Sequence, residues 1–310
     1  MSSSVFFSIL IPVYNWDVRS LLQNLHGQCL ELDEQRGIEI IVIDDGSNEK
    51  FDTASLAEQL SLVIYEEFSV NRGRVAVRNA LLDKGKGEYV LFCDADMLPD
   101  HDDFMQVYFD QAKAGCEIVC GGISYLQSRA GDVDCSFYLY KSKKTEALSA
   151  VDRNVTPWRY LFTSNTMLRR DILDSIRFDS RFEGYGFEDI EWAIRLSEAY
   201  IIKHVDNTCS HMGVLTKQQV YTNMRDSINN YVLLLSLHPE RTAGSGAVTF
   251  ATRFEILSVS LLTVADAVLS KLFSFIPWNP VLFFVFQCDK VVLLARALKE
   301  KKENPKVQIS

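Results

Sequence analysis

The sequence has no surplus of positive charge, and this limits the partners that it can bind. Lys and Arg number 32 against 41 Asp and Glu, so the 310-residue chain carries a formal net charge of -9. A protein whose main partner is a nucleic-acid backbone is usually basic. Nucleic acid is therefore excluded as the principal partner, whereas a local basic pocket for one diphosphate is not.

Disulfide and redox motifs are also lacking. The 7 cysteines are odd in number and form no C-x-x-C pair, which disfavours a disulfide framework and a thioredoxin-like site. The first residues are polar and uncharged, and the apolar stretch after them contains Pro12 and leads into Asn15 and Asp17. This indicates a buried first strand rather than a signal peptide. We therefore expect reduced thiols and a cytoplasmic protein.

The tail of the chain contains no hydrophobic run that is long enough to span a bilayer. Its longest uncharged run, Leu272 to Cys288, is broken by Pro277 and Pro280, and a spanning helix needs about 20 residues. The apolar fraction of 47% and the charged fraction of 24% are ordinary for globular proteins. The chain therefore predicts a folded, enzyme-sized body.

Four short apolar runs occur in the first hundred residues, and segments with helical spacing lie between them. Alternation of this kind predicts βαβ units and a parallel sheet, whose ligand crevice lies beyond the carboxyl ends of the strands. No G-x-G-x-x-G follows the first strand, and Gly85 and Gly87 precede a strand instead, which disfavours a nicotinamide-dependent dehydrogenase. The predicted strands are Phe6 to Val13, Ile38 to Ile43, Leu62 to Tyr65 and Tyr89 to Cys93.

The pattern after residue 116 is less regular. Helices are predicted at Glu188 to Ala199 and at Lys217 to Leu237, and a last strand at Tyr200 to Val205. The stretch Ala243 to Gly246 resembles a linker, which predicts a catalytic domain at 1–242 and a helical region at 243–310. Further strand-like pieces, around a basic loop at Lys141 to Lys144, are Ile118 to Tyr125, Phe137 to Tyr140 and Tyr160 to Leu168.

The region 253–302 has the pattern of an amphipathic helical hairpin. It leaves two interpretations open: docking on the protein's own surface or on a partner subunit through oligomerisation, and binding at a membrane interface. One side of its first helix is polar (Glu255, Thr263, Asp266, Ser270, Ser274) and the other apolar (Leu257, Leu261, Val264, Val268, Leu272). Aromatic residues (Trp278, Phe283, Phe284, Phe286) followed by basic ones keep the membrane interpretation open.

Two carboxylates, Asp94 and Asp96, follow the fourth predicted strand. An i, i+2 pair that leaves a strand end can aim both groups toward one point, and hard oxygen ligands suit Mg²⁺ or Mn²⁺. Such an ion would bridge a donor diphosphate and neutralise the leaving group. The alternative is that both acids cap a helix that begins near Pro99 or His101.

Further polar residues lie near the ends of the other predicted strands. Asp44 and Asp45 end the second strand, where carboxylates can accept hydrogen bonds from a base or a ribose. Asn71-Arg72-Gly73 then opens a helix that carries Arg78; arginine can reach a nucleotide or its phosphate, and glycine permits close backbone approach. The alternative for Asp44 and Asp45 is that they form a turn and a helix cap.

These motifs together resemble the family 2 glycosyltransferases of the GT-A fold. The resemblance rests on Phe7 to Asn15, Ile43 to Ser47, Asn71-Arg72-Gly73 with Arg78 and Asn79, and Asp94-Ala95-Asp96, and it extends to about residue 215. It implies a Rossmann-like α/β fold with a mostly parallel central sheet, here followed by a C-terminal helical hairpin. The nucleotide-sugar-binding residues that it implies are Pro12, Tyr14, Asn15, Asp44, Asp45, Arg72, Gly73, Arg78, Asp94 and Ala95.

An acidic motif lies further along, at Phe182 to Glu191, and resembles that of galactosyltransferases and N-acetylgalactosaminyltransferases. That motif usually has Gly where this chain has Phe187. The resemblance implies that Asp189 is the general base for the acceptor hydroxyl and that Glu188 orients acceptor or base. An alcohol needs such a base to react. The alternative role, as first-turn acids that complement a helix dipole, is compatible with catalysis.

The remaining site predictions concern metal and acceptor. His211 follows the last predicted strand, and the resemblance supports it as a third metal ligand beside Asp94 and Asp96, in a site for Mn²⁺ or Mg²⁺. Trp158, Asn165 and Gly186 are predicted to face the acceptor, although ordinary structural roles explain them nearly as well.

The function that this pattern predicts is metal-dependent transfer of a sugar from a nucleotide diphosphate sugar, with uridine as the nucleotide, to a hydroxyl of a glycan or lipid-linked acceptor. The family 2 resemblance implies inversion at the anomeric carbon. No Q-x-x-R-W motif of processive polymerases is found, so one sugar per encounter is expected, in the cytoplasm or on the inner membrane face. The alternatives are a sugar nucleotidyltransferase and a non-catalytic scaffold that binds partners through its tail.

Overall fold

The computed structural model describes residues 5–32, 37–128 and 133–303, and these fall into two compact units. Within the described ranges, the first unit takes the residues up to 128 together with 143–183 and 188–213. The second takes 133–142, 184–187 and 214–303. The C-terminal part of the second unit thus begins at residue 214, whereas the sequence pattern predicted a boundary at residue 243.

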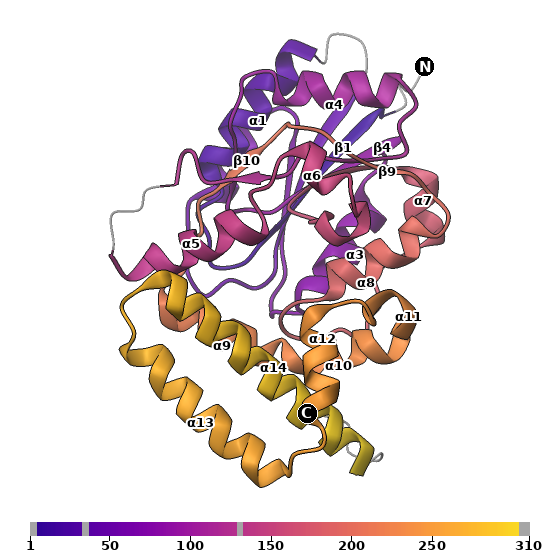
Figure 1. Ribbon diagram of the computed structural model, residues 1–310. Coiled ribbons are helices and arrows are strands. Elements are labelled where there is room, and N and C mark those ends of the chain that lie inside the picture. The colour runs from indigo at the N-terminus through magenta and orange to yellow at the C-terminus, as the bar shows by residue number, and fades with distance from the viewer. Residues whose placement is uncertain (1–4, 33–36, 129–132, 304–310) are drawn as a thin grey trace. The chain divides into compact units, whose positions relative to one another are not determined.

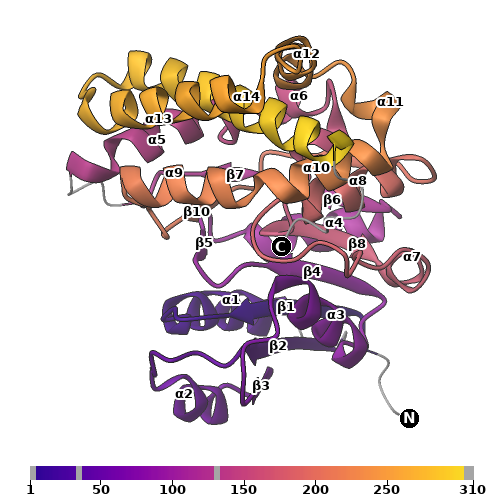
Figure 2. The ribbon, with the colours of Figure 1, turned by 90° about the horizontal axis from the view of Figure 1, so that it is seen from below.

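The first unit is built on a mostly parallel sheet, as predicted. Its strands follow one another in the order β3-β2-β1-β4-β8-β6-β9, much of which can be followed in Figure 2. Only β8 runs against its neighbours β4 and β6, whereas the other pairs are parallel. The strands are β1 (Phe7–Val13), β2 (Ile38–Asp44), β3 (Val63–Glu67), β4 (Tyr89–Cys93), β8 (Asn165–Arg169), β6 (Ile118–Cys120) and β9 (Ile202–His204).

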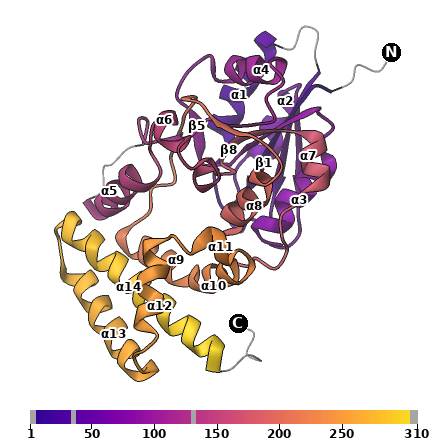
Figure 3. The ribbon, with the colours of Figure 1, turned by 45° about the vertical axis from the view of Figure 1, so that its right-hand side comes forward.

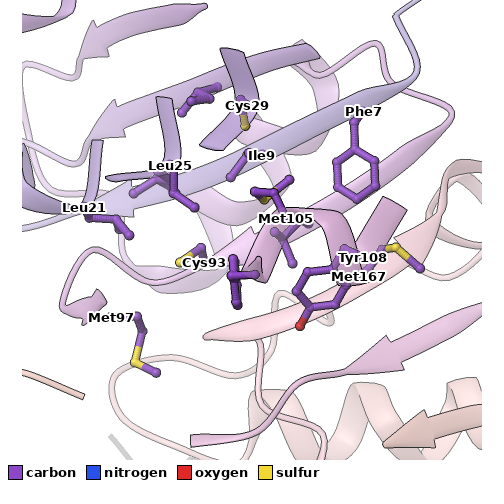
Figure 4. Close-up of a cluster of buried hydrophobic side chains, with 14 of the residues drawn as sticks. Phe7, Ile9, Leu21, Leu25, Cys29, Cys93, Met97, Met105, Tyr108 and Met167 are labelled. Atoms are coloured by element: carbon purple, nitrogen blue, oxygen red, sulfur yellow. The ribbon is translucent and has the colours of Figure 1, made fainter. Parts of the chain in front are cut away.

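Both faces of this sheet are buried, because alternate residues of the central strands enter two separate cores. Ile9 and Leu91 pack with the helices α1 and α4 in one core, part of which Figure 4 shows. Leu10 and Val90 pack with α3, α7 and α8 in the other. The helices of this unit are α1 (Arg19–Leu32), α2 (Thr53–Gln59), α3 (Arg74–Lys84), α4 (Phe104–Lys113), α6 (Ala150–Arg153), α7 (Arg170–Ser175) and α8 (Glu188–Ser197).

A second, smaller sheet brings residues from distant parts of the chain to the end of β4. It consists of β5 (Met97–Pro99), β10 (Cys209–His211) and β7 (Ile123–Ser124), with β10 in the middle. Because β10 pairs with β5 in antiparallel register, His211 lies opposite Met97. The turn that contains the two acids after β4 is thereby placed beside His211.

Three local predictions were wrong. Phe137 to Tyr140 and the basic loop after it form the helix α5 (Ser136–Thr145), in which Phe137 packs on Phe273 and Phe286; tertiary contacts outweigh a short apolar run. The stretch from Tyr160 forms a strand only at Asn165–Arg169, and a 3₁₀ turn occupies Pro157–Tyr160. The long predicted helix after Lys217 is two helices that meet at Ser227.

The second unit is helical, and the predicted hairpin is present in it. Its long helices α13 and α14 lie side by side, and α14 also packs on α9, α10 and α12. Figures 1 and 3 show α13 and α14 lying side by side within this unit. Besides residues 136–142 of α5, its helices are α9 (Lys217–Asp226), α10 (Ile228–Leu237), α11 (Pro239–Thr242), α12 (Gly246–Phe254), α13 (Val259–Phe275) and α14 (Asn279–Glu303). Among the described residues, no helix combines the length and the apolar character needed to cross a membrane.

Candidate active site

Asp94 and Asp96 lie in the short turn between β4 and β5, and their side chains have different partners. The turn is closed by a hydrogen bond from the amide of Met97 to the carbonyl of Asp94, at 3.1 Å. Asp94 faces Arg78, and Asp96 faces His211. The two carboxylates after β4 therefore point to different partners, whereas the sequence pattern allowed both to point toward one place.

Arg78 joins the turn after β4 to the start of α8. Its side chain is only 4% exposed, and its guanidinium lies 3.2 Å from Asp94, 3.1 Å from Glu188 and 3.4 Å from Asp189. A buried guanidinium needs such charged partners, because an unpaired charge away from water is costly. One arginine thus holds together carboxylates of the two acidic motifs that the sequence singles out.

Asp189 is held in place by Thr163 as well as by Arg78. The hydroxyl of Thr163 donates to the Asp189 carboxylate at 3.0 Å, and its backbone amide donates at 3.3 Å. Burial raises the pKa of Asp189 to about 6; Arg78 opposes the rise, whereas Glu188 and Asp94 add to it. A carboxylate with this pKa is ionised at neutral pH and still basic enough to accept a proton.

Asp96 and His211 form the second part of the site. Nε2 of His211 lies 3.4 Å from Oδ2 of Asp96, and the amide of Met212 donates to the backbone carbonyl of Asp96 at 2.7 Å. Burial raises the pKa of Asp96, and His211 opposes this rise. A carboxylate in the turn before β5 and an imidazole at the end of β10 that face each other are a donor set that suits Mn²⁺.

Within residues 5–32, 37–128 and 133–303 there is no group of three or more His, Cys, Asp or Glu side chains arranged to hold a metal ion. The donor set provided by this chain is therefore the Asp96 and His211 pair, with Asp94 held by Arg78. A Mg²⁺ or Mn²⁺ ion at a substrate phosphate commonly has few protein ligands, because phosphate oxygens and water complete its shell. The residues present fit an ion of that kind.

Gly213 controls how closely the chain passes Asp96, although the sequence pattern did not single it out. A Cβ atom at this position would lie 2.5 Å from Oδ2 of Asp96 and 3.1 Å from Cε1 of His211. Only glycine therefore leaves the carboxylate where it is. In the sequence this residue is only a glycine two positions after His211. Its closeness to Asp96 becomes apparent only from the pairing of β10 with β5.

If Asp96 and His211 hold a divalent ion, the substitution Gly213→Ala should weaken its binding by roughly 10–100-fold, because the added Cβ displaces the Asp96 carboxylate from His211. The measurement is a calorimetric titration of the protein with Mn²⁺. Gly27→Ala serves as the control, since a Cβ there meets nothing within 4 Å. An unchanged Mn²⁺ titration in the Gly213 variant would contradict this role.

The segments predicted to bind the nucleotide are tied together by Asp45. Its carboxylate accepts backbone hydrogen bonds from Arg72 at 2.8 Å and from Gly73 at 2.9 Å. Gly46 has φ +70, and a Cβ there would lie 2.5 Å from the carbonyl carbon of Val70, so these two loops can touch only through glycine. Asp45 thus orders the Arg72 loop, and direct contact of either residue with a base stays a prediction.

The loop after β1 is ordered in a similar way. Asn15, at φ 50, accepts hydrogen bonds on its Oδ1 from the amides of Asn48 and Glu49, and its own amide donates to Ser47. Asp44 accepts from the amide of Ser47 at 2.7 Å. Tyr14 is exposed at this edge. Pro12 lies in β1 and Ala95 in the turn after β4, so these predicted residues all stand at or near strand ends.

The residues predicted to face the acceptor have defined structural surroundings. The Asn165 side chain is buried. Its Oδ1 accepts a hydrogen bond from the Tyr108 hydroxyl at 2.5 Å, and its Nδ2 donates to the carbonyls of Gly122 and Asn207 at 2.9 Å. Trp158 lies in the 3₁₀ turn and packs partly buried on the α3 and α8 side of the sheet. Contact with an acceptor stays a prediction for both.

Gly186 and Phe187 belong to the second unit, and both have left-handed backbones, with φ 87 and 72. This conformation costs a residue other than glycine about 1–2 kcal/mol. The Phe187 ring stacks on Tyr231 at 4.4 Å, which offsets that cost. Asn230 donates to the carbonyl of Gly186 at 2.9 Å. Phe187 thus adopts the left-handed backbone conformation that a glycine would adopt at this position. Contact of Gly186 with an acceptor stays a prediction.

A family model described as glycosyl transferase family 2 matches residues 8–177. The chain is 25% identical over 240 residues to the uncharacterized glycosyltransferase YfnE of Bacillus subtilis, covering 62% of this chain and 60% of that protein. It is 26% identical over 201 residues to the amylovoran biosynthesis glycosyltransferase AmsB of Erwinia amylovora, covering 57% and 60%. In both cases the match spans less than two thirds of the relative.

Solved structures share the fold at low identity. S. aureus TarS 1-349 in complex with UDP has a TM-score of 0.53 at 15% identity, with 98% of this chain and 93% of that chain covered. The mannosyltransferase PcManGT from Pyrobaculum calidifontis, in complex with GDP-Man and Mn²⁺, also has a TM-score of 0.53 at 15% identity, covering 97% and 88%. The predicted GT-A fold is confirmed. The acidic motif at 182–191 lies beyond the residues that the family model matches.

Proposed function

Because the chain belongs to glycosyl transferase family 2, we propose that it transfers a sugar from a nucleotide diphosphate sugar to an acceptor hydroxyl. One observation carries this proposal: Arg78 joins Asp94 of the first acidic motif to Asp189 of the second. Asp96, which faces His211 of β10, lies in the same turn as Asp94. An acceptor base and a place for the diphosphate would thus adjoin one strand end.

We propose that Asp189 acts as the general base. It takes the proton of the acceptor hydroxyl while that oxygen forms a bond to the anomeric carbon of the donor sugar. The bond from this carbon to the diphosphate oxygen breaks, and its electron pair leaves with the diphosphate. Attack from the opposite face inverts the anomeric centre. Thr163 and Arg78 keep the Asp189 carboxylate in one orientation during this step.

Asp96 and His211 would hold a divalent cation, Mn²⁺ or Mg²⁺. When bound, such an ion neutralises the charge that develops on the leaving diphosphate. Mn²⁺ accompanies the nucleotide sugar in the Pyrobaculum mannosyltransferase, which supports a metal of this kind here. Asp94, which is paired with Arg78, is proposed as an assisting ligand.

The nucleotide is proposed to be uridine diphosphate. TarS was solved with UDP and PcManGT with GDP-Man, so the fold itself accommodates both bases. The proposal of uridine rests on the resemblance of Asp45 and Arg72 to base-binding positions. In the structure Asp45 orders the amides of Arg72 and Gly73, and the Arg72 guanidinium lies over the Phe68 ring at 3.9 Å.

The acceptor is proposed to be a glycan or a lipid-linked glycan, and the reaction to take place in the cytoplasm. AmsB is named for the biosynthesis of amylovoran, which supports a role in making a polysaccharide. The odd number of cysteines without a C-x-x-C pair supports a reducing compartment.

A panel of UDP-sugars and GDP-sugars, each assayed for transfer with Mn²⁺ and with EDTA, tests the proposed function. We expect turnover with a UDP-sugar that depends on Mn²⁺, and a β-linked product by NMR from an α-linked donor. Preference for a GDP-sugar would refute uridine, full activity in EDTA would refute the metal, and an α-linked product would refute single displacement. A chain that binds no nucleotide sugar at all in calorimetry would instead support a non-catalytic scaffold.

A further inference from the structure

Asp100 accepts hydrogen bonds from four side chains in and beside the small sheet. It follows β5 directly and is partly buried. Each of its two carboxylate oxygens accepts from two donors, at 2.6 Å from each hydroxyl and at 3.2 Å from the amide. The donors are the hydroxyls of Ser124, Thr208 and Ser210 and the side-chain amide of Gln127. Two carboxylate oxygens offer about four acceptor positions, so the acceptor capacity of Asp100 is filled.

This arrangement requires an ionised carboxylate. Burial raises the pKa of Asp100, but the hydrogen bonds from the surrounding side chains outweigh burial, and the pKa lies below its ordinary value. Hydrogen bonds to an ionised acceptor are roughly twice as strong as those between neutral groups. An amide at this position would replace one acceptor oxygen with a donor, which would then face two of the four donors. Asparagine has a similar shape but does not supply the same acceptors.

The hydrogen bonds of Asp100 connect the three strands of the small sheet. Ser124 belongs to β7 and Ser210 to β10, whereas Asp100 itself follows β5. The backbone amide of Asp100 also donates to the carbonyl of Thr208 at 3.1 Å, just before β10 begins. One residue therefore ties together segments that lie far apart in the sequence.

The small sheet needs such a tie because its strands are short. β10 pairs with β5 over three residues and with β7 over two, whereas strands are usually about 5–6 residues long. The same short pairing carries part of the candidate site, since His211 lies opposite Met97 and faces Asp96. Asp100 lies at one end of the pairing between β5 and β10, and Asp96 and His211 lie at the other.

We propose that Asp100 is a positioning residue, which holds β10 against β5 and thereby keeps His211 facing Asp96. It acts through Ser210, which precedes His211 in the chain, and through the backbone of Thr208. The inference rests on the proposed function in one respect, because that pair is the one proposed to hold the divalent ion. The amide of Met212 donates to the backbone carbonyl of Asp96 at 2.7 Å, so it reports directly on how firmly the two segments are held together.

Hydrogen exchange of the full chain, followed by NMR without metal or nucleotide sugar, tests this role. In Asp100→Asn the Met212 amide should exchange roughly ten- to a hundredfold faster, because hydrogen bonds to an ionised carboxylate are lost. The amide of Phe68, which donates to the carbonyl of Asp44 at 2.8 Å in the main sheet, should exchange as in the wild type. The milder variant Thr208→Val removes one donor and keeps the branched side chain, so it should speed Met212 exchange by roughly fivefold.

Calorimetry with Mn²⁺ gives the second readout, in which Asp100→Asn should bind the ion roughly tenfold more weakly than the wild type. The matched control is Asp179→Asn, which changes another partly buried acid, one bonded to the backbone amide of Arg181 at 2.9 Å. The control should leave both readouts unchanged.

Unchanged exchange of the Met212 amide in Asp100→Asn would overturn the inference, and so would wild-type Mn²⁺ affinity in that variant. Faster exchange of Phe68 to the same extent as Met212 would also overturn it, because Asp100 would then contribute only to overall stability. Since the exchange is measured without ligands, failure of this inference is distinct from failure of the proposed reaction.

Discussion

The substitution Asp189→Asn should slow sugar transfer by roughly 10²–10⁴-fold and leave the affinity for the nucleotide sugar unchanged. The amide keeps the shape of the carboxylate and can still contact Thr163, but it cannot take the acceptor proton. The effect should therefore appear in kcat, as expected for an interaction made in the transition state. Calorimetry with the nucleotide sugar and a steady-state rate measurement give the two quantities separately.

The matched control is Asp171→Asn, which also removes an acid from the first turn of a helix, α7. If the only role of Asp189 were to complement a helix dipole, the two variants would behave alike, with a small loss of stability and normal turnover. Normal transfer by the Asp189 variant would require a different base on the same fold.

The pH profile provides a second readout of Asp189. Its pKa is raised to about 6, chiefly by burial, and a carboxylate can act as the proposed base only when it is ionised. The value of kcat/KM should therefore be constant above about pH 6 and fall tenfold for each pH unit below it. Removal of Arg78 should move this limb to higher pH, because Arg78 opposes the rise in the pKa of Asp189.

The substitution Asp96→Ala should lower turnover by about 10³-fold or more, because a bound divalent ion contributes several kcal/mol of charge stabilisation at the leaving group. In the variant, His211 would be left without the carboxylate that faces it at 3.4 Å. The measurement is the transfer rate over a range of Mn²⁺ concentrations. The wild type in EDTA should match the variant in Mn²⁺.

The control for this second prediction is Asp102→Asn, an exposed acid six residues further along the chain. It removes one negative charge near the same region and should leave turnover unchanged. Wild-type activity in the Asp96 variant, or undiminished activity in EDTA, would show that the reaction proceeds without the proposed metal.

Local pattern was sufficient to identify the strands β1, β2 and β4, because a strand buried on both faces must be a short apolar run. It also located the partly exposed edge strand β3 and the helix α8. The same pattern placed the acids at strand ends, since topology puts polar residues there in a parallel sheet. It was not sufficient for α5, where Phe137 forms a helix against Phe273 and Phe286. The four-residue run from Phe137 to Tyr140 has no period that distinguishes helix from strand.

The sequence by itself determined the family, the mostly parallel sheet and the order of the acidic motifs, because these depend on local residue types and their spacing. Only the tertiary structure decided which side chains meet. Arg78 was predicted at a nucleotide and is found among three carboxylates, Gly213 gained its role through the pairing of β10 with β5, and Asp266 of α13 is buried because it pairs with Arg225 and Arg296. These outcomes depend on partners far away in the chain, and no local pattern encodes the distance between two side chains.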